Sequence, residues 1–203
     1  GEWLTKSRLG YDLDYLASDN HNTLSLQNDA PQRQPDDYRY MLGQRGSQWL
    51  YVNSGDPTLV AISFGTDYIY ATGDATSLYN SAYESVTDIS HASRSIFWLK
   101  PDHIVIYDRA ESKTANRFKR FWIHSPTQPS ISGKLATMTT TNGQHLYTST
   151  LLPTNASISI QTEQNEPSGA PAEEENISYR LLVEAPGGPQ SARFLHVLQG
   201  ADS

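Results

Sequence analysis

The sequence contains no cysteine. It therefore cannot form a disulfide framework, a cysteine-ligated zinc site or a thiol nucleophile. Basic residues are also few, since 15 Lys and Arg stand against 22 Asp and Glu among 203 residues. This balance argues against sequence-independent binding to nucleic acid, which requires clustered Lys and Arg. No apolar run reaches the roughly 18 residues of a membrane-spanning helix, and the first ten residues lack the basic-then-apolar order of a signal peptide.

Residues that favour helices are scarce, whereas residues that favour strands are common. The chain has 23 Ser, 17 Thr and 12 Tyr but only 5 Lys, a composition that suits pleated, half-buried surfaces. Short apolar runs alternate with polar residues at a period of two, which is typical of strands with one buried face. Such runs occupy residues 23–26, 59–64, 103–107, 157–160 and 193–198.

Turn signals separate these runs at the spacing of an all-β domain. They predict about a dozen strands in an antiparallel β-sandwich of the supersandwich type, with very little helix. Only residues 74–80 are expected to form a helical turn. Asn142-Gly143 predicts a type I′ hairpin turn, and residues 163–176, with five Glu and two Pro, predict a solvated loop. We expect residues 1–203 to form one domain, and both ends suggest excision from a longer chain.

One segment predicts a specific hairpin. Two apolar strands flank the Lys100-Pro101-Asp102 corner, Arg94 enters the first strand and Asp108 leaves the second. Antiparallel pairing about this corner is expected to bring Arg94 and Asp108 together at one end of the hairpin. A charge-assisted pair there would fix the register of the two strands.

His21 is the histidine with the most suggestive surroundings, because polar loop residues lead from it into a strand. Its imidazole could tie down the loop by hydrogen bonds, bind a metal or act as a base. A structural metal site needs three or four converging ligands, and no second His stands two or four residues away. The residues alone favour hydrogen bonding and leave the other two roles open.

Familiar catalytic motifs are absent from the sequence. It contains no G-x-S-x-G elbow, no H-E-x-x-H motif and no glycine-rich phosphate loop. Adjacent carboxylates such as Asp36 and Asp37 would point to opposite faces of a strand. The sequence therefore nominates no catalytic residue.

Five short motifs, taken together and in order, resemble the C-terminal β-sandwich of heparinase II/III-like polysaccharide lyases. They are His21-Asn22-Thr23, residues 73–79 (G-D-A-T-x-x-Y), residues 94–109 (R-x-x-x-x-L-K-P-x-x-I-V-x-x-D-R), Leu151-Leu152-Pro153 and residues 194–199 (F-L-H-V-L-Q).

The resemblance implies a two-part enzyme, with an N-terminal helical toroid, a β-sandwich and a cleft between them. Such enzymes cleave uronate-containing polysaccharides such as glycosaminoglycans by β-elimination, and most of their catalytic groups come from the helical part. It also implies a periplasmic or secreted protein whose partners are an anionic polysaccharide and the upstream helical domain, with no nucleic acid or membrane partner.

The resemblance further implies that His21 is one ligand of a structural zinc in the full-length protein. The other ligands would precede residue 1, and the chain has no H-x-H stretch ahead of His21. We therefore expect no cofactor in this chain, no zinc held by His21 in it, and no lyase activity from it alone.

Two other functions remain open from the residues. A non-catalytic carbohydrate-binding module could stack sugars on exposed aromatic rings, and a purely structural sandwich could brace another domain. Core positions are favoured for most of the aromatic residues that lie in strand patterns, which are Trp49, Tyr51, Trp98 and Trp122.

Overall fold

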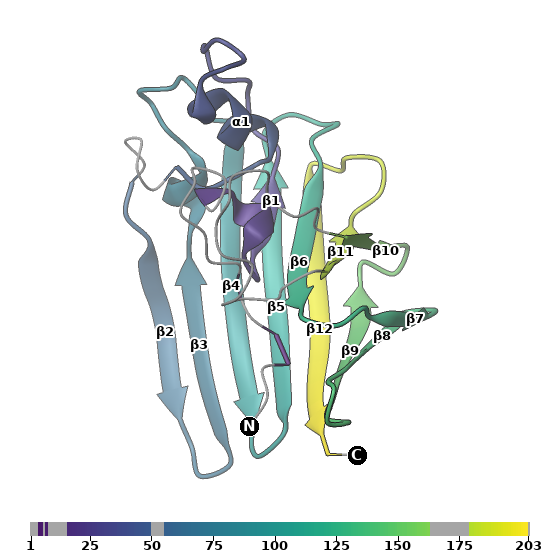
Figure 1. Cartoon of the computed structure of the whole chain (residues 1–203). Coiled ribbons are helices and arrows are strands. Elements are labelled where there is room, and N and C mark those ends of the chain that lie inside the picture. The colour runs from purple at the N-terminus through teal and green to yellow at the C-terminus, as the bar shows by residue number, and fades with distance from the viewer. Residues whose placement is uncertain (1–3, 6, 8–15, 50–54, 163–178, 203) are drawn as a thin grey trace.

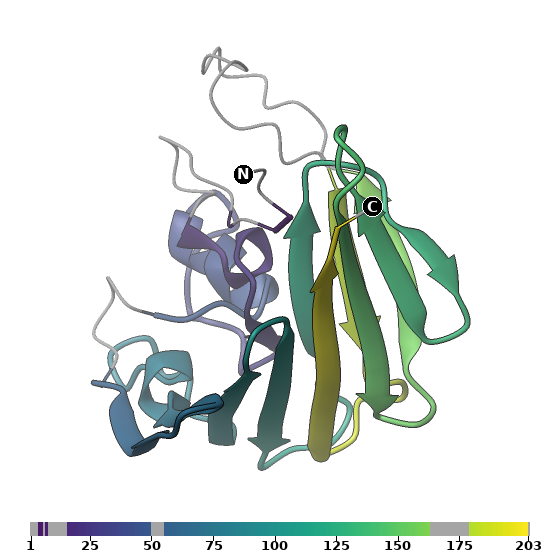
Figure 2. The ribbon, with the colours of Figure 1, turned by 90° about the horizontal axis from the view of Figure 1, so that it is seen from below.

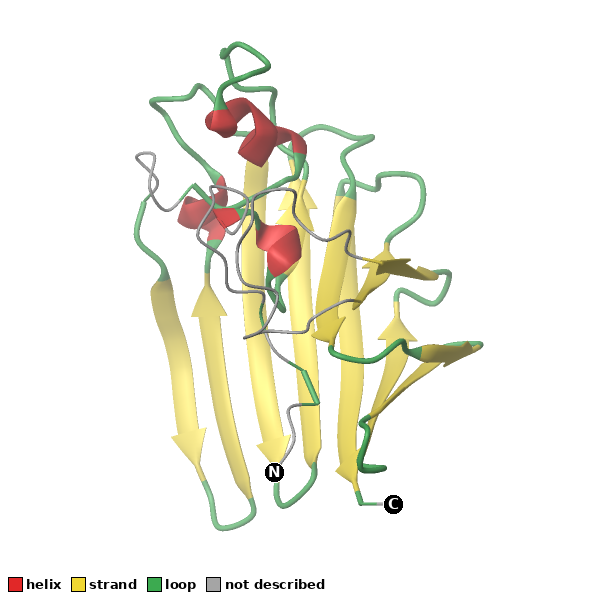
Figure 3. Cartoon of the chain, viewed as in Figure 1, coloured by secondary structure: helices red, strands yellow, loops and turns green. Residues whose placement is uncertain are grey.

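The computed structural model describes residues 4–5, 7, 16–49, 55–162 and 179–202, and these residues form a β-sandwich of two antiparallel sheets. The larger sheet has eight strands in the order β2-β3-β4-β5-β12-β9-β8-β7, and the smaller has four in the order β1-β6-β11-β10 (Figures 1 and 3). The predicted fold class and the predicted dozen strands are confirmed.

The strands match the period-two runs of the sequence. Their bounds are β1 Leu24–Leu26, β2 Thr58–Phe64, β3 Tyr68–Asp74, β4 Ile89–Leu99, β5 His103–Ser112, β6 Lys119–Ser125, β7 Ser130–Ser132, β8 Leu135–Thr139, β9 His145–Leu152, β10 Ser157–Thr162, β11 Tyr179–Glu184 and β12 Ser191–Ala201. The expected loop at residues 163–176 lies outside the described residues.

Helical structure is short and gathers at one end of the larger sheet (Figures 1 and 2). The expected turn is present as the 3₁₀ helix η3 (Thr76–Tyr79), and η2 (Ser18–Asn20) is a second one. The α-helix α1 (Tyr38–Gln44) was not expected; the Asp37 side chain caps it by accepting a hydrogen bond from the Arg39 amide. No helix in the described part of the chain has the length and apolarity to cross a membrane.

The hairpin of β4 and β5 forms as predicted, and Arg94 pairs directly with Asp108 across it. The position of the pair was predicted wrongly, because β4 begins at Ile89, so Arg94 lies in the middle of the hairpin and not at its end. The Asn142 turn also differs from the prediction. Gly143 has a φ of 87°, but Asn142 has no positive φ, so the type I′ turn, which needs both, does not form.

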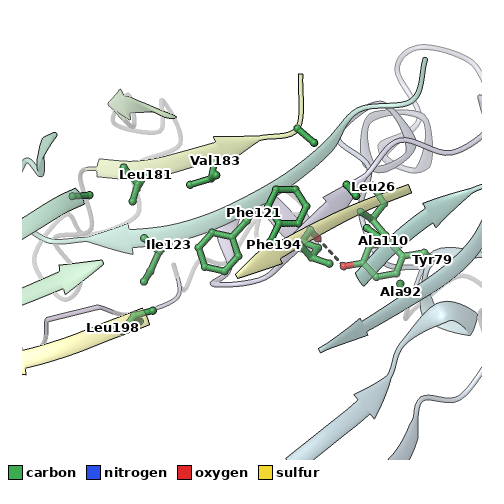
Figure 4. Close-up of a cluster of buried hydrophobic side chains, with 14 of the residues drawn as sticks. Leu26, Tyr79, Ala92, Ala110, Phe121, Ile123, Leu181, Val183, Phe194 and Leu198 are labelled. Carbon is green, nitrogen blue, oxygen red and sulfur yellow. Dashed lines mark hydrogen bonds between the residues drawn. The ribbon is translucent and has the colours of Figure 1, made fainter. Parts of the chain in front are cut away.

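The hydrophobic core lies between the smaller sheet and one half of the larger sheet. Phe121 and Ile123 of β6 and Leu181 and Val183 of β11 face Phe194 of β12, among other buried side chains (Figure 4). We call the face of the larger sheet that carries Phe194 its inner face, and the opposite face its outer face. On β12, buried even-numbered residues alternate with more exposed odd-numbered ones.

The other half of the inner face is open. Cross-strand register aligns one row as Ile62, Ala71, Ile96 and Ile106, and a second row as Phe64, Ile69, Trp98 and Ile104. Six large side chains of this region are between 37% and 68% exposed and together define the open apolar face: Leu59, Ile62, Phe64, Ile96, Trp98 and Ile104.

Trp98 is the exception among the aromatic residues for which core positions were mostly favoured. Its side chain is 38% exposed, because no described strand of the smaller sheet covers this end of β4. Trp49 and Trp122 are buried as expected. Tyr51 lies outside the described residues.

Candidate functional site

Three of the motifs that carry the resemblance meet at one small pocket. The pocket has a volume of about 160 Å³ and lies beside β1, η3, the end of β3 and the first half of β4. Its lining includes residues from the H-N-T motif, the G-D-A-T-x-x-Y motif and the start of the hairpin motif, namely Thr23, Gly73, Asp74, Ala75, Tyr79 and Arg94. Residues 71 positions apart in the sequence thus share one cavity.

Arg94 forms the central ion pair of this pocket. Its Nε and Nη2 donate to the two carboxylate oxygens of Asp108 at 2.7 and 2.8 Å, and Asp108 is fully buried. Burial alone would lower the pKa of Arg94, but the charge and hydrogen bonds of Asp108 outweigh burial and raise it. Both side chains point inward because their row on the sheet also holds Phe194.

The H-N-T segment joins this ion pair to the smaller sheet. The third donor of Arg94, Nη1, gives its hydrogen bond to the carbonyl oxygen of Asn22 at 2.6 Å. The Asn22 side chain accepts from the backbone N–H of His124 on β6 at 2.8 Å and donates to Thr5 at 3.0 Å. Asn22 therefore ties the loop, β4 and β6 together.

Tyr79 closes the pocket from the η3 side. Its hydroxyl donates to the Leu24 carbonyl at 2.7 Å (dashed line in Figure 4) and accepts from the Gln48 side chain at 3.3 Å. The ring is buried, and burial raises the pKa of its hydroxyl. At neutral pH Tyr79 is therefore a hydrogen-bonding support and not a base.

The polar groups of this pocket bond to one another and hold the surrounding strands together as a scaffold. Each nitrogen of the Arg94 guanidinium already has an acceptor in the protein, and Asp108 is buried behind it. A substrate carboxylate could reach Arg94 only by displacing Asp108 or the Asn22 carbonyl. The motif residues are thus explained by their role in joining β1, β3, β4 and β6.

His21 lies at the edge of this scaffold. It is partly exposed, its backbone N–H donates to the Ser18 carbonyl at 3.1 Å, and its carbonyl accepts from the Thr23 amide at 2.8 Å. Among the residues that the structure describes, no group of three or more His, Cys, Asp or Glu side chains could hold a metal ion. The described residues therefore do not supply a zinc site, and the zinc role of His21 stays a prediction about the longer protein.

An ion cluster near His21 was missed from the sequence. Asp19 accepts from Arg45 at 2.8 Å and from Arg180 of β11 at 3.1 Å, so the loop before β1 is fixed to both α1 and the smaller sheet. No local pattern signals this cluster, because Asp19 and Arg180 are 161 residues apart in the sequence.

Comparison with known sequences gives no match: no family model and no curated protein resembles the chain. Comparison with solved structures gives clear matches. A heparinase III gene product matches with a TM-score of 0.64 at 11% identity over 93% of this chain. The heparan sulfate lyase HepC from Pedobacter heparinus matches with a TM-score of 0.63 at 12% identity over 97% of it.

A further heparinase III structure matches with a TM-score of 0.61 at 13% identity. The chain spans only 25% to 27% of the length of these proteins, so the likeness concerns a part of each. At this identity the likeness is one of fold. The chain is a β-sandwich that resembles one domain of the heparinase III polysaccharide lyases.

Proposed function

We propose that this chain is the β-sandwich domain of a polysaccharide lyase that cleaves uronate-containing polysaccharides by β-elimination. The observation that carries the proposal is the match of 93% to 97% of the chain to one domain of heparinase III and of a heparan sulfate lyase. The convergence of three motifs on the Arg94 pocket supports it, because it gives these residues a common place in the fold.

In β-elimination, a base removes the proton on the carbon next to the uronate carboxylate. The electron pair left behind forms a carbon–carbon double bond as the bond to the glycosidic oxygen breaks, and an acid protonates that oxygen. A positive or hydrogen-bonding group must also stabilise the carboxylate as negative charge builds on it. By the resemblance, most of these groups belong to a helical domain outside this chain.

The part of this chain in that enzyme is to brace the helical domain and form one wall of the cleft. The open apolar face is the surface we assign to this contact. It presents no charged side chain among its six exposed members, so its partner must offer an apolar surface. The much greater length of the solved lyases indicates the source of that partner, which is the rest of the same polypeptide.

The Arg94 scaffold lies next to this face. In the sheet register, the row of Gly73, Arg94 and Asp108 directly adjoins the row of Ala71, Ile96 and Ile106. A domain that docks on the apolar rows therefore lies against the pocket as well. This position would make the pocket rim, with Gln48 and Ser93, part of the cleft wall.

The remaining expectations for the whole protein are part of the same proposal. Its substrate is an anionic polysaccharide, it is periplasmic or secreted, and His21 contributes to a structural zinc completed by upstream residues. The net charge of −7 is consistent with a domain that does not bind a polyanion strongly by itself.

The proposal is tested by an elimination assay on the isolated chain and on the product of the complete coding sequence. The readout is the ultraviolet absorbance of the unsaturated uronate product on heparan-type and alginate-type substrates. We expect product from the complete protein and none from the isolated chain or its His21→Ala variant. Product from the isolated chain that disappears in His21→Ala would instead make His21 catalytic. No product from the complete protein on any uronate polysaccharide would refute the lyase proposal.

A stand-alone carbohydrate-binding module has less support. It requires aromatic rings with a free face, and Trp98 is the exposed tryptophan among those the structure describes. The Lys100 ammonium lies 5.7 Å from the centre of its ring, and the Trp98 Nε1 donates to the Pro101 carbonyl at 3.3 Å. The Lys100 contact covers part of the Trp98 ring on which a sugar would stack, and the indole N–H is already bonded.

A further inference from the structure

A second and larger pocket lies where β9 separates from β12, and no role described above involves it. β12 pairs with β5 from Ser191 onward but with β9 only from Leu195 onward. The first residues of β12 therefore have a strand neighbour on one side only. A pocket of about 480 Å³ occupies the other side, lined by Pro153, Thr154, Asn155, Pro189, Ser191 and Arg193 among others.

Arg193 is the charged side chain in the lining of this pocket. It is exposed, and in the part of the chain that the structure describes it makes no hydrogen bond or ion pair. It stands directly opposite Arg109 of β5 on the outer face. Like charges in opposing positions destabilise a sheet, so an anion between them would be favourable.

The carboxylate of Glu111, two residues from Arg109, is already engaged. Glu111 accepts from Arg109 at 3.2 Å and from the Ser191 hydroxyl at 3.4 Å. The two guanidinium groups thus hold more donors than this carboxylate can accept.

The backbone adds donors on the same side. Gln190 accepts from Ser112 on β5, so the even-numbered residues at this end of β12 direct their backbone groups toward β5. Ser191 and Arg193 consequently direct both their backbone N–H and their C=O groups away from β5, toward the side where β9 is missing. The pocket therefore combines a cation, outward backbone N–H groups and polar side chains.

We infer that this pocket binds the acidic group of a sugar, a carboxylate or a sulfate ester, through Arg193. Arg presents a planar fork of donors that matches either oxyanion. The volume suits a sugar ring, and Pro153 and Pro189 offer apolar walls beside Thr154 and Asn155. The choice of an acidic sugar as the ligand rests on the proposed function, whereas the anion site itself does not.

The test is a titration of the 203-residue chain followed by backbone amide NMR shifts. The probes are glucuronate and glucose 6-sulfate, which separate the two oxyanions, and glucose as the neutral control. We expect saturable shifts at Ser191, Arg193 and Asn155 with at least one acidic probe and none with glucose. Arg193→Gln should weaken binding about tenfold or more, and Arg193→Lys should also weaken it because lysine lacks the bidentate fork.

Lys100→Gln is the matched control. It removes the same charge at the opposite end of the β4–β5 hairpin, roughly 20 Å along the strand, and should leave binding unchanged. Shifts that do not saturate, that occur equally with glucose, or that survive in Arg193→Gln would overturn the inference. If acidic-sugar binding depends on Arg193 but the complete protein has no elimination activity, the proposed function fails and this site stands. If activity is present and binding ignores Arg193, the site fails and the function stands.

Discussion

The imidazole of His196 stacks on the ring of Phe121, with 3.9 Å between their centres. His196 belongs to β12 and Phe121 to β6, so this contact joins the two sheets in the middle of the core. The imidazole is fully buried, and its Nε2 has no hydrogen-bond partner among the described residues. Burial, with a smaller effect of the Arg94 charge, lowers the pKa of His196 to about 3.

The first prediction is that this histidine makes the fold sensitive to acid. The unfolded chain binds a proton at His196 below pH 6.5, whereas the folded chain binds it only near pH 3. The unfolding free energy therefore falls as the pH drops through this range, by roughly 4 kcal/mol from this group. Urea unfolding of His196→Leu between pH 7 and pH 4 should show a shallower decline. His145→Gln, at a partly exposed site on β9, is the control substitution. An equal slope in His196→Leu would contradict the prediction.

The second prediction concerns the Arg94–Asp108 pair. Asp108→Ala leaves the largely buried Arg94 guanidinium, whose side chain is 23% exposed, without its counter-ion and should cost about 3 kcal/mol of unfolding free energy. Arg94→Met should also lower the unfolding free energy, because it leaves the buried Asp108 carboxylate without its counter-ion. The double variant should cost clearly less than the sum of the two single changes. Denaturant titrations of all four proteins complete this cycle, and additive costs would show that the two side chains do not stabilise each other.

The third prediction separates folding from docking at the open apolar face. Phe64→Ser and Ile62→Ser change side chains that are 68% and 53% exposed, so the unfolding free energy of the isolated chain should change by about 0.5 kcal/mol or less. Under the proposed function, the same changes in the complete protein should loosen the sandwich from the helical domain and lower elimination activity. Limited proteolysis between the two domains reports the loosening directly. Unchanged activity and proteolysis would remove this face from the interdomain contact.

The fourth prediction compares two neighbouring glycines in the turn between β11 and β12. Gly187 and Gly188 both have positive φ values, 77° and 56°. A Cβ on Gly187 would meet nothing within 4 Å, whereas one on Gly188 would lie 2.7 Å from backbone atoms of Asn116. Gly187→Ala should therefore cost about 1 kcal/mol, the strain of the backbone alone. Gly188→Ala should cost about 1–3 kcal/mol more, and equal thermal unfolding midpoints would argue against the close approach to Asn116.

Much of the fold could be predicted because strands carry their own periodic signal. The alternation at residues 193–198, for example, appears unchanged in β12. The pairing of Arg94 with Asp108 followed from their equal distance from the Lys100-Pro101-Asp102 corner. α1 escaped notice because its seven residues are too few for a helical period to stand out, although Asp37 was an available capping signal.

Other features could not be predicted because they depend on how distant segments of the chain are arranged. Alternation shows which side chains share a face, but it cannot show whether another layer covers that face. Trp98 and Phe194 both lie on the inner face, yet only Phe194 has the smaller sheet above it. The Arg193 pocket was equally invisible, since it depends on the residue at which β9 leaves β12. The Asp19 cluster likewise requires the arrangement of three distant segments.

Because the smaller sheet covers only part of the larger sheet, the strands of the larger sheet should differ in local stability. β2 pairs with β3 alone and exposes most of its side chains, whereas β12 has strands on both sides and alternate buried residues. Backbone amides of β2 should therefore exchange with solvent deuterium far sooner than those of β12. The Arg94–Asp108 pair lies between these extremes, held by β4, β5 and the Asn22 carbonyl. Local opening of β2 therefore need not spread to β4 and β5. The edge of the larger sheet can open transiently while the hydrophobic core stays folded.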